Sequence, residues 1–213
     1  VPILPSNFSY KGSLSIERFD PGKTLQGNFT IIVPKDALPG TYPLIIQTIY
    51  HDANMYPFST VSPYILTYNN SEPSNIYGTL SDLELTKEGS DKLRLALRNL
   101  DGKEHRVEIH LYLPKELKCD TYKQTLLLGP KEEKQITYKI SSFGALPGSN
   151  YIVLASLEYE DEGYHYTSFA RGIVKIVEKK ENPKILWASI LLFVFLLIIF
   201  VYFKMRGGKV EKK

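Results

Sequence analysis

The chain has 213 residues, which leaves room for one or two domains with buried cores. Its many tyrosines and β-branched residues alternate with polar ones, a composition that favours strands over helices. Of the 26 basic and 23 acidic side chains, five and one lie in the last ten residues, so the first 203 residues carry a net charge of −1. This balance implies no basic face for nucleic-acid binding, and we expect no nucleic-acid partner.

Cysteine usage excludes two further classes. Cys119 is the only cysteine, so the chain has no intrachain disulfide and no Cys-based metal site. No local motif marks Cys119 as a nucleophile, and we expect a small side chain that is buried or partly exposed.

A segment of about 65 residues occurs twice in the chain. The stretch ALPGTYPLIIQTIYHD, residues 37–52, returns as ALPGSNYIVLASLEYED, residues 145–161. Extending the match outward aligns residues 3–68 with residues 112–177. The period of about 108 residues is the size of one β-sandwich and too long for a solenoid unit.

Residues 1–70 form the first predicted domain, a partial Ig-like β-sandwich. Residues 14–31 read as a strand, a Pro-Gly turn and a second strand. Counterparts of the strands at 78–111 are absent, so one apolar face would be open to water. Three covers are conceivable: upstream sequence, a second protein subunit, or the segment VPILPSNFSY at the start of the chain. A second subunit at this half-sandwich is the partner that we expect.

Residues 71–178 form the second predicted domain, a complete Ig-like β-sandwich. Seven alternating segments are separated by Gly, Pro and Asp turns at intervals of 8–15 residues, as in sandwiches of this class. The predicted fold class is therefore all-β, with tandem Ig-like sandwiches of which the first is incomplete.

Each copy of the repeated phrase places a tyrosine directly after a Pro-Gly turn, Tyr42 in the first copy and Tyr151 in the second. Leu-Pro-Gly-x-Tyr followed by alternation resembles the tyrosine corner of fibronectin type III domains. It also resembles that of the NPCBM-associated and cell-adhesion-related sandwich families of microbial surface proteins. The resemblance implies that both tyrosines are structural. The chain departs from fibronectin type III in lacking a core Trp, and from antibody domains in lacking paired cysteines.

Motifs for catalysis are missing from the sequence. The four histidines do not coincide under the repeat, and no metal-ligand spacing, nucleophile motif or phosphate loop occurs. An acidic cluster at the last hairpin tip reads as a solvated turn (Glu158, Glu160, Asp161, Glu162). We therefore expect no enzyme activity, no cofactor and no metal.

Aromatic residues near the two hairpin turns are the candidate contact residues. Tyr56 and Phe58 follow the first turn, and Tyr164 and Tyr166 follow the second. Tyrosine offers a rigid amphipathic surface, so these rings are candidates for contact with a protein partner or a glycan.

A membrane segment is predicted near the carboxyl end. Residues 185–203 contain no charge, Gly or Pro, and as a helix they would span about 28 Å, close to the hydrocarbon thickness of a bilayer. A linker at 179–184 precedes this predicted transmembrane helix, and a basic tail at 204–213 follows it. The tail favours the cytoplasm for the carboxyl end.

Three Asn-x-Ser/Thr sequons, at Asn7, Asn28 and Asn69, are candidate glycosylation sites and favour an amino-terminal part outside the cytoplasm. The rival topology is a tail-anchored protein with a cytosolic β-domain. The function that we expect is that of a membrane-anchored, non-enzymatic surface or periplasmic protein, a scaffolding subunit of a membrane complex. The alternative is an envelope-tethered carbohydrate-binding or adhesion module.

Overall fold

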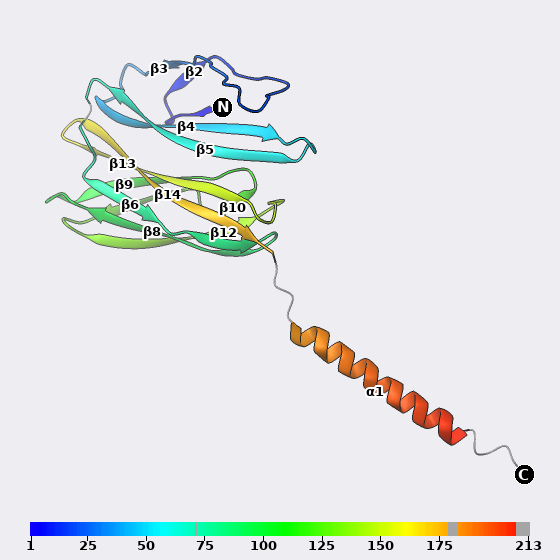
Figure 1. Cartoon of the computed structure of the whole chain (residues 1–213). Helices are drawn as coiled ribbons and strands as arrows, with labels where there is room; N and C mark the ends of the chain where they lie inside the picture. The colour runs from blue at the N-terminus through cyan, green and yellow to red at the C-terminus, as the bar shows by residue number, and fades with distance from the viewer. Residues whose placement is uncertain (71, 179–182, 208–213) are drawn as a thin grey trace, which may run out of the picture. The chain divides into compact units, whose positions relative to one another are not determined.

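The computed structural model describes all residues except 71, 179–182 and 208–213, and in the carboxy-terminal helix it describes the side chains of residues 191–204 alone. Residues Val1–Glu178 form one compact unit and Lys179–Lys213 a second. Within the described residues, the first unit holds the strands and the second holds the helix α1, Pro183–Gly207 (Figure 1).

The strands divide between the two halves of the first unit. Those of the amino-terminal half are β1 (Pro2–Ile3), β2 (Ser9–Lys11), β3 (Thr30–Ile32), β4 (Gly40–His51) and β5 (Pro57–Tyr68). Those of the carboxy-terminal half are β6 (Ile76–Leu80), β7 (Leu83–Thr86), β8 (Ser90–Asn99), β9 (His105–Tyr112), β10 (Leu117–Cys119), β11 (Lys123–Leu128), β12 (Glu133–Ser142), β13 (Asn150–Asp161) and β14 (Tyr164–Val177).

The carboxy-terminal half is a β-sandwich. One sheet has the order β10-β12-β8-β6, and the other contains β11-β9-β13-β14 with β7 paired to β14. Alternate residues of each strand enter the core between the sheets, among them Leu93, Leu95 and Leu97 of β8 and Val107 and Ile109 of β9. The predicted β-sandwich is confirmed in this half.

Cys119 ends the short strand β10, which the sequence did not predict. Its side chain is buried, and its Sγ lies 3.1 Å from the carbonyl oxygen of Thr121. Burial raises the pKa of the Cys119 thiol, which makes the reactive thiolate scarce at neutral pH.

The amino-terminal half is built around the hairpin β4–β5, and β4 joins this half to the sandwich. β4 runs parallel to β14 and pairs with it at Gly40 and His165, so a single sheet of eight strands extends through both halves. Gly40 has a φ of +146°, and a Cβ atom there would lie 1.9 Å from the carbonyl oxygen of His165. Only glycine permits this approach.

The predicted domain boundary at residues 70 and 71 lies between β5 and β6. Both sides of it belong to the same compact unit, because the sheet continues from β14 into β4. The division into two domains stays a prediction, since a shared sheet does not reveal how each half folds.

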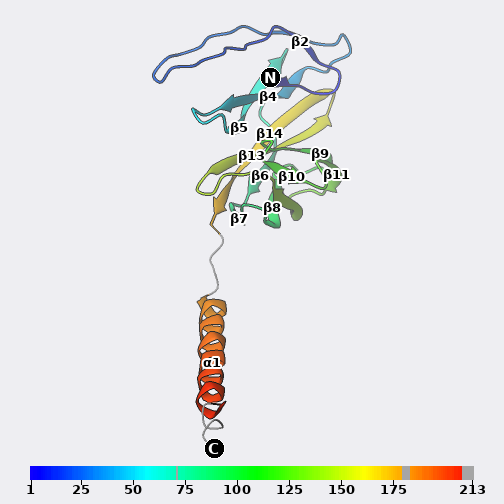
Figure 2. The ribbon, with the colours of Figure 1, turned by 90° about the vertical axis from the view of Figure 1, so that its right-hand side faces the viewer.

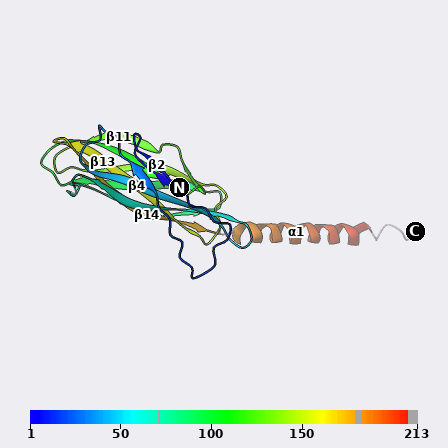
Figure 3. The ribbon, with the colours of Figure 1, turned by 90° about the horizontal axis from the view of Figure 1, so that it is seen from above.

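A small second core fills the space between the halves. Ile45 of β4 and Val61 of β5 pack with Tyr112 of β9 and Leu154 of β13. Figures 1 and 3 both show β4 over the strands β13 and β14. The hairpin therefore covers the outer face of the sandwich with one of its own faces.

A polar contact also joins the halves. Ser59 of β5 donates two hydrogen bonds of 2.7 Å to the buried Glu116 carboxylate, one from its amide and one from its hydroxyl. The Ser59 hydroxyl also accepts the amide hydrogen of Lys115 at 2.7 Å. These bonds satisfy a carboxylate that would otherwise be costly to bury.

The opposite face of the hairpin faces away from the sandwich. In the second copy of the repeat, the residues that correspond to this face lie in the core of the sandwich. Tyr50 and Tyr64 lie on it, 50% and 55% exposed, whereas Tyr159, the counterpart of Tyr50 in β13, is 4% exposed. β2 and β3 lie on this side (Figure 1), but they leave it partly uncovered. Of the three ways considered for covering this face, the segment at the start of the chain covers only a part of it.

The predicted strands within residues 14–31 are shorter in the structure. Regular pairing is limited to β2 and β3, and residues 12–29 form a long connection that reaches away from the sheets (Figure 2). Leu14, Ile16 and Phe19 in this connection are exposed. The alternation of 14–31 was therefore misleading, because no sheet lies beside the segment to pair with it.

The helix α1 covers the predicted span, and its described apolar side chains from Leu191 to Phe203 are largely exposed. Over the residues that the structure describes, no helix combines the length and apolar character needed to cross a membrane. The transmembrane assignment of 185–203 is thus not supported by this structure. Residues 179–182 of the predicted linker and 208–213 of the predicted tail lie outside the described residues.

Candidate functional site

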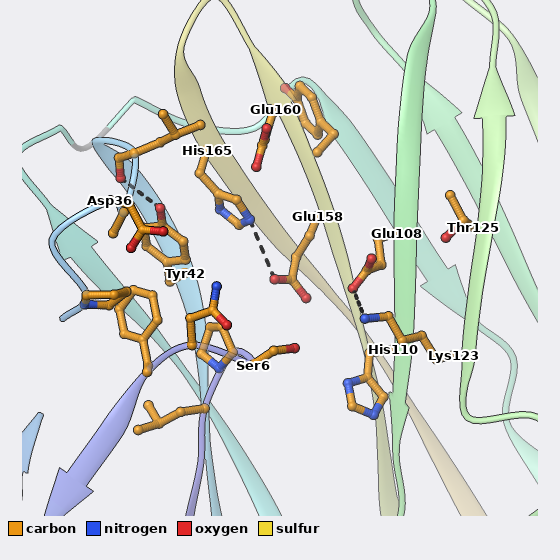
Figure 4. A pocket seen from close by; sticks show the side chains of 18 of the residues that line it. Ser6, Asp36, Tyr42, Glu108, His110, Lys123, Thr125, Glu158, Glu160 and His165 are labelled. Carbon is orange, nitrogen blue, oxygen red and sulfur yellow. Dashed lines mark hydrogen bonds and ion pairs between the residues drawn. The ribbon is translucent and has the colours of Figure 1, made fainter. Parts of the chain in front are cut away.

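A cleft of about 840 Å³ opens between residues 4–8 and 34–42 on one side and the outer face of β9, β11, β13 and β14 on the other (Figure 4). Its volume is within the range of small-ligand sites. The charged and titratable groups that line it are Asp36, Tyr42, Arg106, Glu108, His110, Tyr112, Lys123, Glu158, Tyr159, Glu160 and His165.

Glu158 of β13 occupies the centre of this cleft, between His165 and the ion pair of Glu108 with Lys123 (Figure 4). Its side chain is 13% exposed. One carboxylate oxygen accepts a 2.7 Å hydrogen bond from the Ser156 hydroxyl, and the other lies 3.7 Å from Nε2 of His165. Burial, reinforced by the charge of Glu108, raises the pKa of Glu158 to about 7.

His165 is held firmly by the amino-terminal half. Its Nδ1 lies 2.7 Å from the carbonyl oxygen of Thr41, and because a carbonyl only accepts, Nδ1 carries a proton. The ring stacks on Tyr42 with centroids 4.1 Å apart and planes at 10°. Burial lowers the pKa of His165, which favours the neutral ring at pH 7 and weakens its attraction to Glu158.

The other end of the cleft carries a second histidine. The rings of His110 and Tyr112 lie 4.4 Å apart. Burial, together with the nearby Lys123 ammonium, lowers the pKa of His110, and burial raises the pKa of Tyr112 to about 12. Neither histidine therefore adds positive charge to the cleft at neutral pH.

Backbone and side-chain bonds between β4 and β14 fix the shape of the cleft. The carbonyl oxygen of Thr41 accepts from the Thr167 hydroxyl at 2.7 Å, and the Thr41 hydroxyl accepts from the Thr167 amide at 2.9 Å. The amide of His165 donates to the Pro39 carbonyl at 2.9 Å. The two walls are thus tied together where the cleft begins.

The acidic cluster at the β13–β14 tip differs from its predicted role as a solvated turn. Glu160 and Glu162 are exposed, but Glu158 faces the cleft and is mostly buried. The reason is that β13 turns Glu158 toward its outer face, which residues 4–8 and 34–42 overlie.

Three side chains near this tip could together hold a metal ion, namely Asp101, His105 and Asp161. Nε2 of His105 lies 2.8 Å from the Asp101 carboxylate, and the Lys103 ammonium lies 3.2 Å from the Asp161 carboxylate. Internal hydrogen bonds and an ion pair thus account for the arrangement, and it carries no further assignment.

Both tyrosines that were assigned to corners bond back to upstream backbone. The Tyr42 hydroxyl donates to the carbonyl of Leu38 at 2.7 Å, and the Tyr151 hydroxyl accepts from the amide of Leu146 at 3.3 Å. The two contacts span four and five residues. Both have the geometry of a tyrosine corner.

The four candidate contact aromatics do not form one group, although the Tyr56 and Phe58 rings lie together with centroids 5.4 Å apart. The Tyr56 hydroxyl donates to the carbonyl of Gly144 at 2.6 Å, and Phe58 stacks on Tyr50. Tyr166 stacks on Tyr159, with ring centroids 5.0 Å apart.

Of these four, Tyr164 alone is exposed, and the others are half-buried. The tips of β4–β5 and β13–β14 lie at opposite ends of the strands (Figure 1). The four rings therefore form no single platform, and their contact with a partner or a glycan stays a prediction.

The three sequon residues are all exposed. Asn7 lies on the rim of the cleft, Asn28 in the long connection, and Asn69 directly after β5 with a φ of 55°. Each is accessible, and their modification stays a prediction.

No family model matches the chain, and no curated protein matches it. A fragment of native alpha-2-macroglobulin from Escherichia coli is similar over 49% of this chain and 17% of its own, with 11% identity and a TM-score of 0.41. A PapD-like domain of human CEP192 is similar over 54% and 95%, with 10% identity and a TM-score of 0.37.

A non-cellulosomal cohesin from Archaeoglobus fulgidus is similar over 50% of this chain and 94% of its own, with 12% identity and a TM-score of 0.38. With TM-scores below 0.5, these three likenesses carry no argument about function. The sandwich assignment rests on the strand pairing of the chain itself.

Proposed function

We propose that this chain is a membrane-anchored, non-enzymatic scaffold whose amino-terminal half binds a partner polypeptide through the uncovered face of the hairpin β4–β5. We call this surface the open face and define it as Leu44, Ile46, Tyr50, Phe58, Tyr64 and Leu66. Strand register places these residues on one side of the hairpin.

One observation carries the proposal. Counterparts of the open face in β13 and β14 are buried core residues beneath the sheet β10-β12-β8-β6, among them Val153, Tyr159 and Val174. In the amino-terminal half no sheet of that kind lies over β4–β5 among the described residues. Covering a large apolar side chain is worth about 1.5–3 kcal/mol, so several such residues favour binding.

The equivalent surface in the sandwich also indicates the chemistry of the partner. There the cover is a β-layer with an alternating apolar face, exemplified by Leu93, Leu95 and Leu97 of β8. We infer that the partner supplies a similar layer. Tyrosines fit such a role, because they bury a large ring and keep a polar hydroxyl at the rim.

The anchor is supported by sequence and by exposure. Residues 185–203 carry no charged side chain, and the described apolar residues of α1 are largely uncovered within their own unit. A helix that is apolar all round suits lipid rather than water. Cationic residues after the span and sequons before it support placing Val1–Glu178 outside the cytoplasm.

Site-specific crosslinking tests the docking proposal. A photo-reactive amino acid placed at Tyr64 of the full chain, in the membranes of the cells that make it, should trap one discrete polypeptide. The matched control is Tyr77 of β6, which is 49% exposed but belongs to the other sheet, and it should trap none. Tyr50→Glu should remove the Tyr64 crosslink, because it places a charge in an apolar contact.

Equal crosslinking from Tyr64 and Tyr77, or no product from Tyr64, would contradict docking at the open face.

Extraction tests the anchor independently. The chain should remain with membranes in alkaline carbonate, and Leu196→Arg combined with Ile198→Arg should reduce its insertion, at about 2.5–3.5 kcal/mol per charge. Recovery of the unsubstituted chain in the soluble fraction would contradict the anchor.

A further inference from the structure

The cleft over Glu158 has an excess of negative charge. Its lining contains the carboxylates Asp36, Glu108, Glu158 and Glu160 and the cations Arg106 and Lys123. Because burial lowers the pKa of both lining histidines, the lining reaches a net charge of −2 above pH 7, where Glu158 is ionised as well. A cleft with low-dielectric walls concentrates such a field on its contents.

This charge is unevenly compensated. Lys123 is engaged by Glu108 at one end of the cleft. Glu158 in the centre accepts a hydrogen bond from the Ser156 hydroxyl, lies 3.7 Å from His165 and is attracted by Lys123 from a distance. A mostly buried carboxylate normally has a paired cation. Among the described residues, no Lys or Arg side chain forms an ion pair with Glu158 at the centre of the cleft.

The walls suit a planar cation. Phe8 and Tyr112 line the cleft, and aromatic rings attract guanidinium groups through their faces. A guanidinium also forms bidentate hydrogen bonds with a carboxylate, which an ammonium cannot do. The volume of about 840 Å³ accommodates an arginine side chain with its flanking backbone.

We propose that the cleft binds an arginine side chain of a polypeptide, with Glu158 as its counter-ion and the aromatic wall against its guanidinium plane. This inference is independent of docking at the open face, because no open-face residue lines the cleft.

Affinity for arginine should depend on pH in a defined direction. The groups around Glu158 are Glu108, His110 and Arg106 of β9, Lys123 of β11, Glu160 and His165 at the hairpin tip, and Asp36 of the overlying segment. A proton on Glu158 competes with the arginine, so with a pKa of about 7 the affinity falls as the pH drops. Between pH 8 and pH 6 the loss is about tenfold.

The test uses the full chain in detergent and two tripeptides that differ only in charge. Acetyl-Gly-Arg-Gly-amide should bind at pH 8 and displace resonances of the cleft, and the peptide with citrulline in place of arginine should bind at least tenfold more weakly. Glu158→Gln should abolish the preference and the pH dependence. Glu84→Gln, an exposed residue of β7, should change neither.

A measurement on the unsubstituted chain keeps the test decisive if Glu158→Gln fails to fold. The pKa of Glu158, read from its carboxyl carbon by NMR, should fall when the arginine peptide saturates the cleft. Equal binding of both peptides, an unchanged pH dependence in Glu158→Gln, or a constant Glu158 pKa would overturn the proposal.

Discussion

At the scale of single residues, buried polar groups differ in whether they have a hydrogen-bond partner. The Tyr151 hydroxyl and the Glu116 carboxylate are both paired. The Tyr138 hydroxyl is the one buried side-chain oxygen or nitrogen without a partner among the described residues. Burial raises its pKa to about 12. An unpaired buried hydroxyl typically costs about 1–3 kcal/mol.

Removing that hydroxyl should therefore stabilise the fold. We expect Tyr138→Phe to raise the free energy of unfolding by about 1 kcal/mol, because the ring keeps its packing and the unpaired group is gone. Tyr151→Phe is the matched control and should lower it by about 1 kcal/mol, since the Leu146 amide loses its acceptor. Urea denaturation distinguishes the two, and a loss of stability in Tyr138→Phe would contradict this reading.

Glu158 predicts a pH dependence of stability. Its pKa is raised from 4.5 to about 7 on folding, so the folded chain binds the proton more tightly, and the associated stability is lost as the pH rises from about 4.5 to 7. For a shift of this size the loss is about 3 kcal/mol. His165 changes the stability in the opposite sense, because burial lowers its pKa. Its contribution to the free energy of unfolding decreases as the pH falls below the ordinary pKa of histidine.

Glu158→Gln isolates the carboxyl contribution, because glutamine cannot ionise. The free energy of unfolding of this variant minus that of the unsubstituted chain should grow between pH 5 and pH 8. A difference that stays constant across this interval would show that Glu158 has an ordinary pKa.

At the scale of elements, the connection between β4 and β14 is the most constrained feature. Gly40 and His165 form the parallel pair between these strands, and the Thr41–Thr167 hydrogen bonds follow directly. A β-carbon on Gly40 would overlap the His165 carbonyl. The attachment of the amino-terminal half therefore depends on a residue without a side chain.

Gly40→Ala should detach β4 from β14. We expect a loss of more than about 2 kcal/mol, from positive-φ strain and overpacking together. Amide hydrogen exchange should accelerate at Thr41 and Thr167 while the sandwich core stays protected. Gly102→Ala is the control, because a Cβ there meets nothing within 4 Å, and it should leave exchange unchanged.

The sequence predicted some strands correctly and others not. Strict alternation, as in β8 and β9, predicted the sandwich strands, because one face of each is buried in a single core. The same alternation failed for residues 14–31, where most of the segment has no neighbouring strand. Alternation of apolar and polar residues shows that a segment is suited to a half-buried strand. It does not show whether a neighbouring strand is present to pair with it.

At the scale of the whole molecule, the sequence predicted the incomplete half but not what it packs against. β13 is apolar on both faces. Ile152 and Leu154 point outward, and they alternate with Val153 and Ala155, which point into the sandwich core. A strand of this kind is covered on both sides. That signal could have revealed the contact with β4–β5, and with it the burial of Glu158 and the formation of the cleft.

The hairpin β4–β5 thus has two different faces. One face packs on the sandwich through Ile45 and Val61 and is closed by the Ser59–Glu116 bonds. The other face retains tyrosines at about half exposure, in positions whose counterparts belong to a core. The account proposed for this chain depends on that second face being covered by another polypeptide.

Side-chain footprinting of Tyr50 and Tyr64 tests this claim most directly. In the purified chain, hydroxyl radicals should oxidise Tyr50, Tyr64 and the reference residue Tyr77 at similar rates, since their exposures are alike. In native membranes we predict several-fold protection of Tyr50 and Tyr64 with Tyr77 unchanged. Equal oxidation of all three residues in membranes and in the purified chain would contradict the claim.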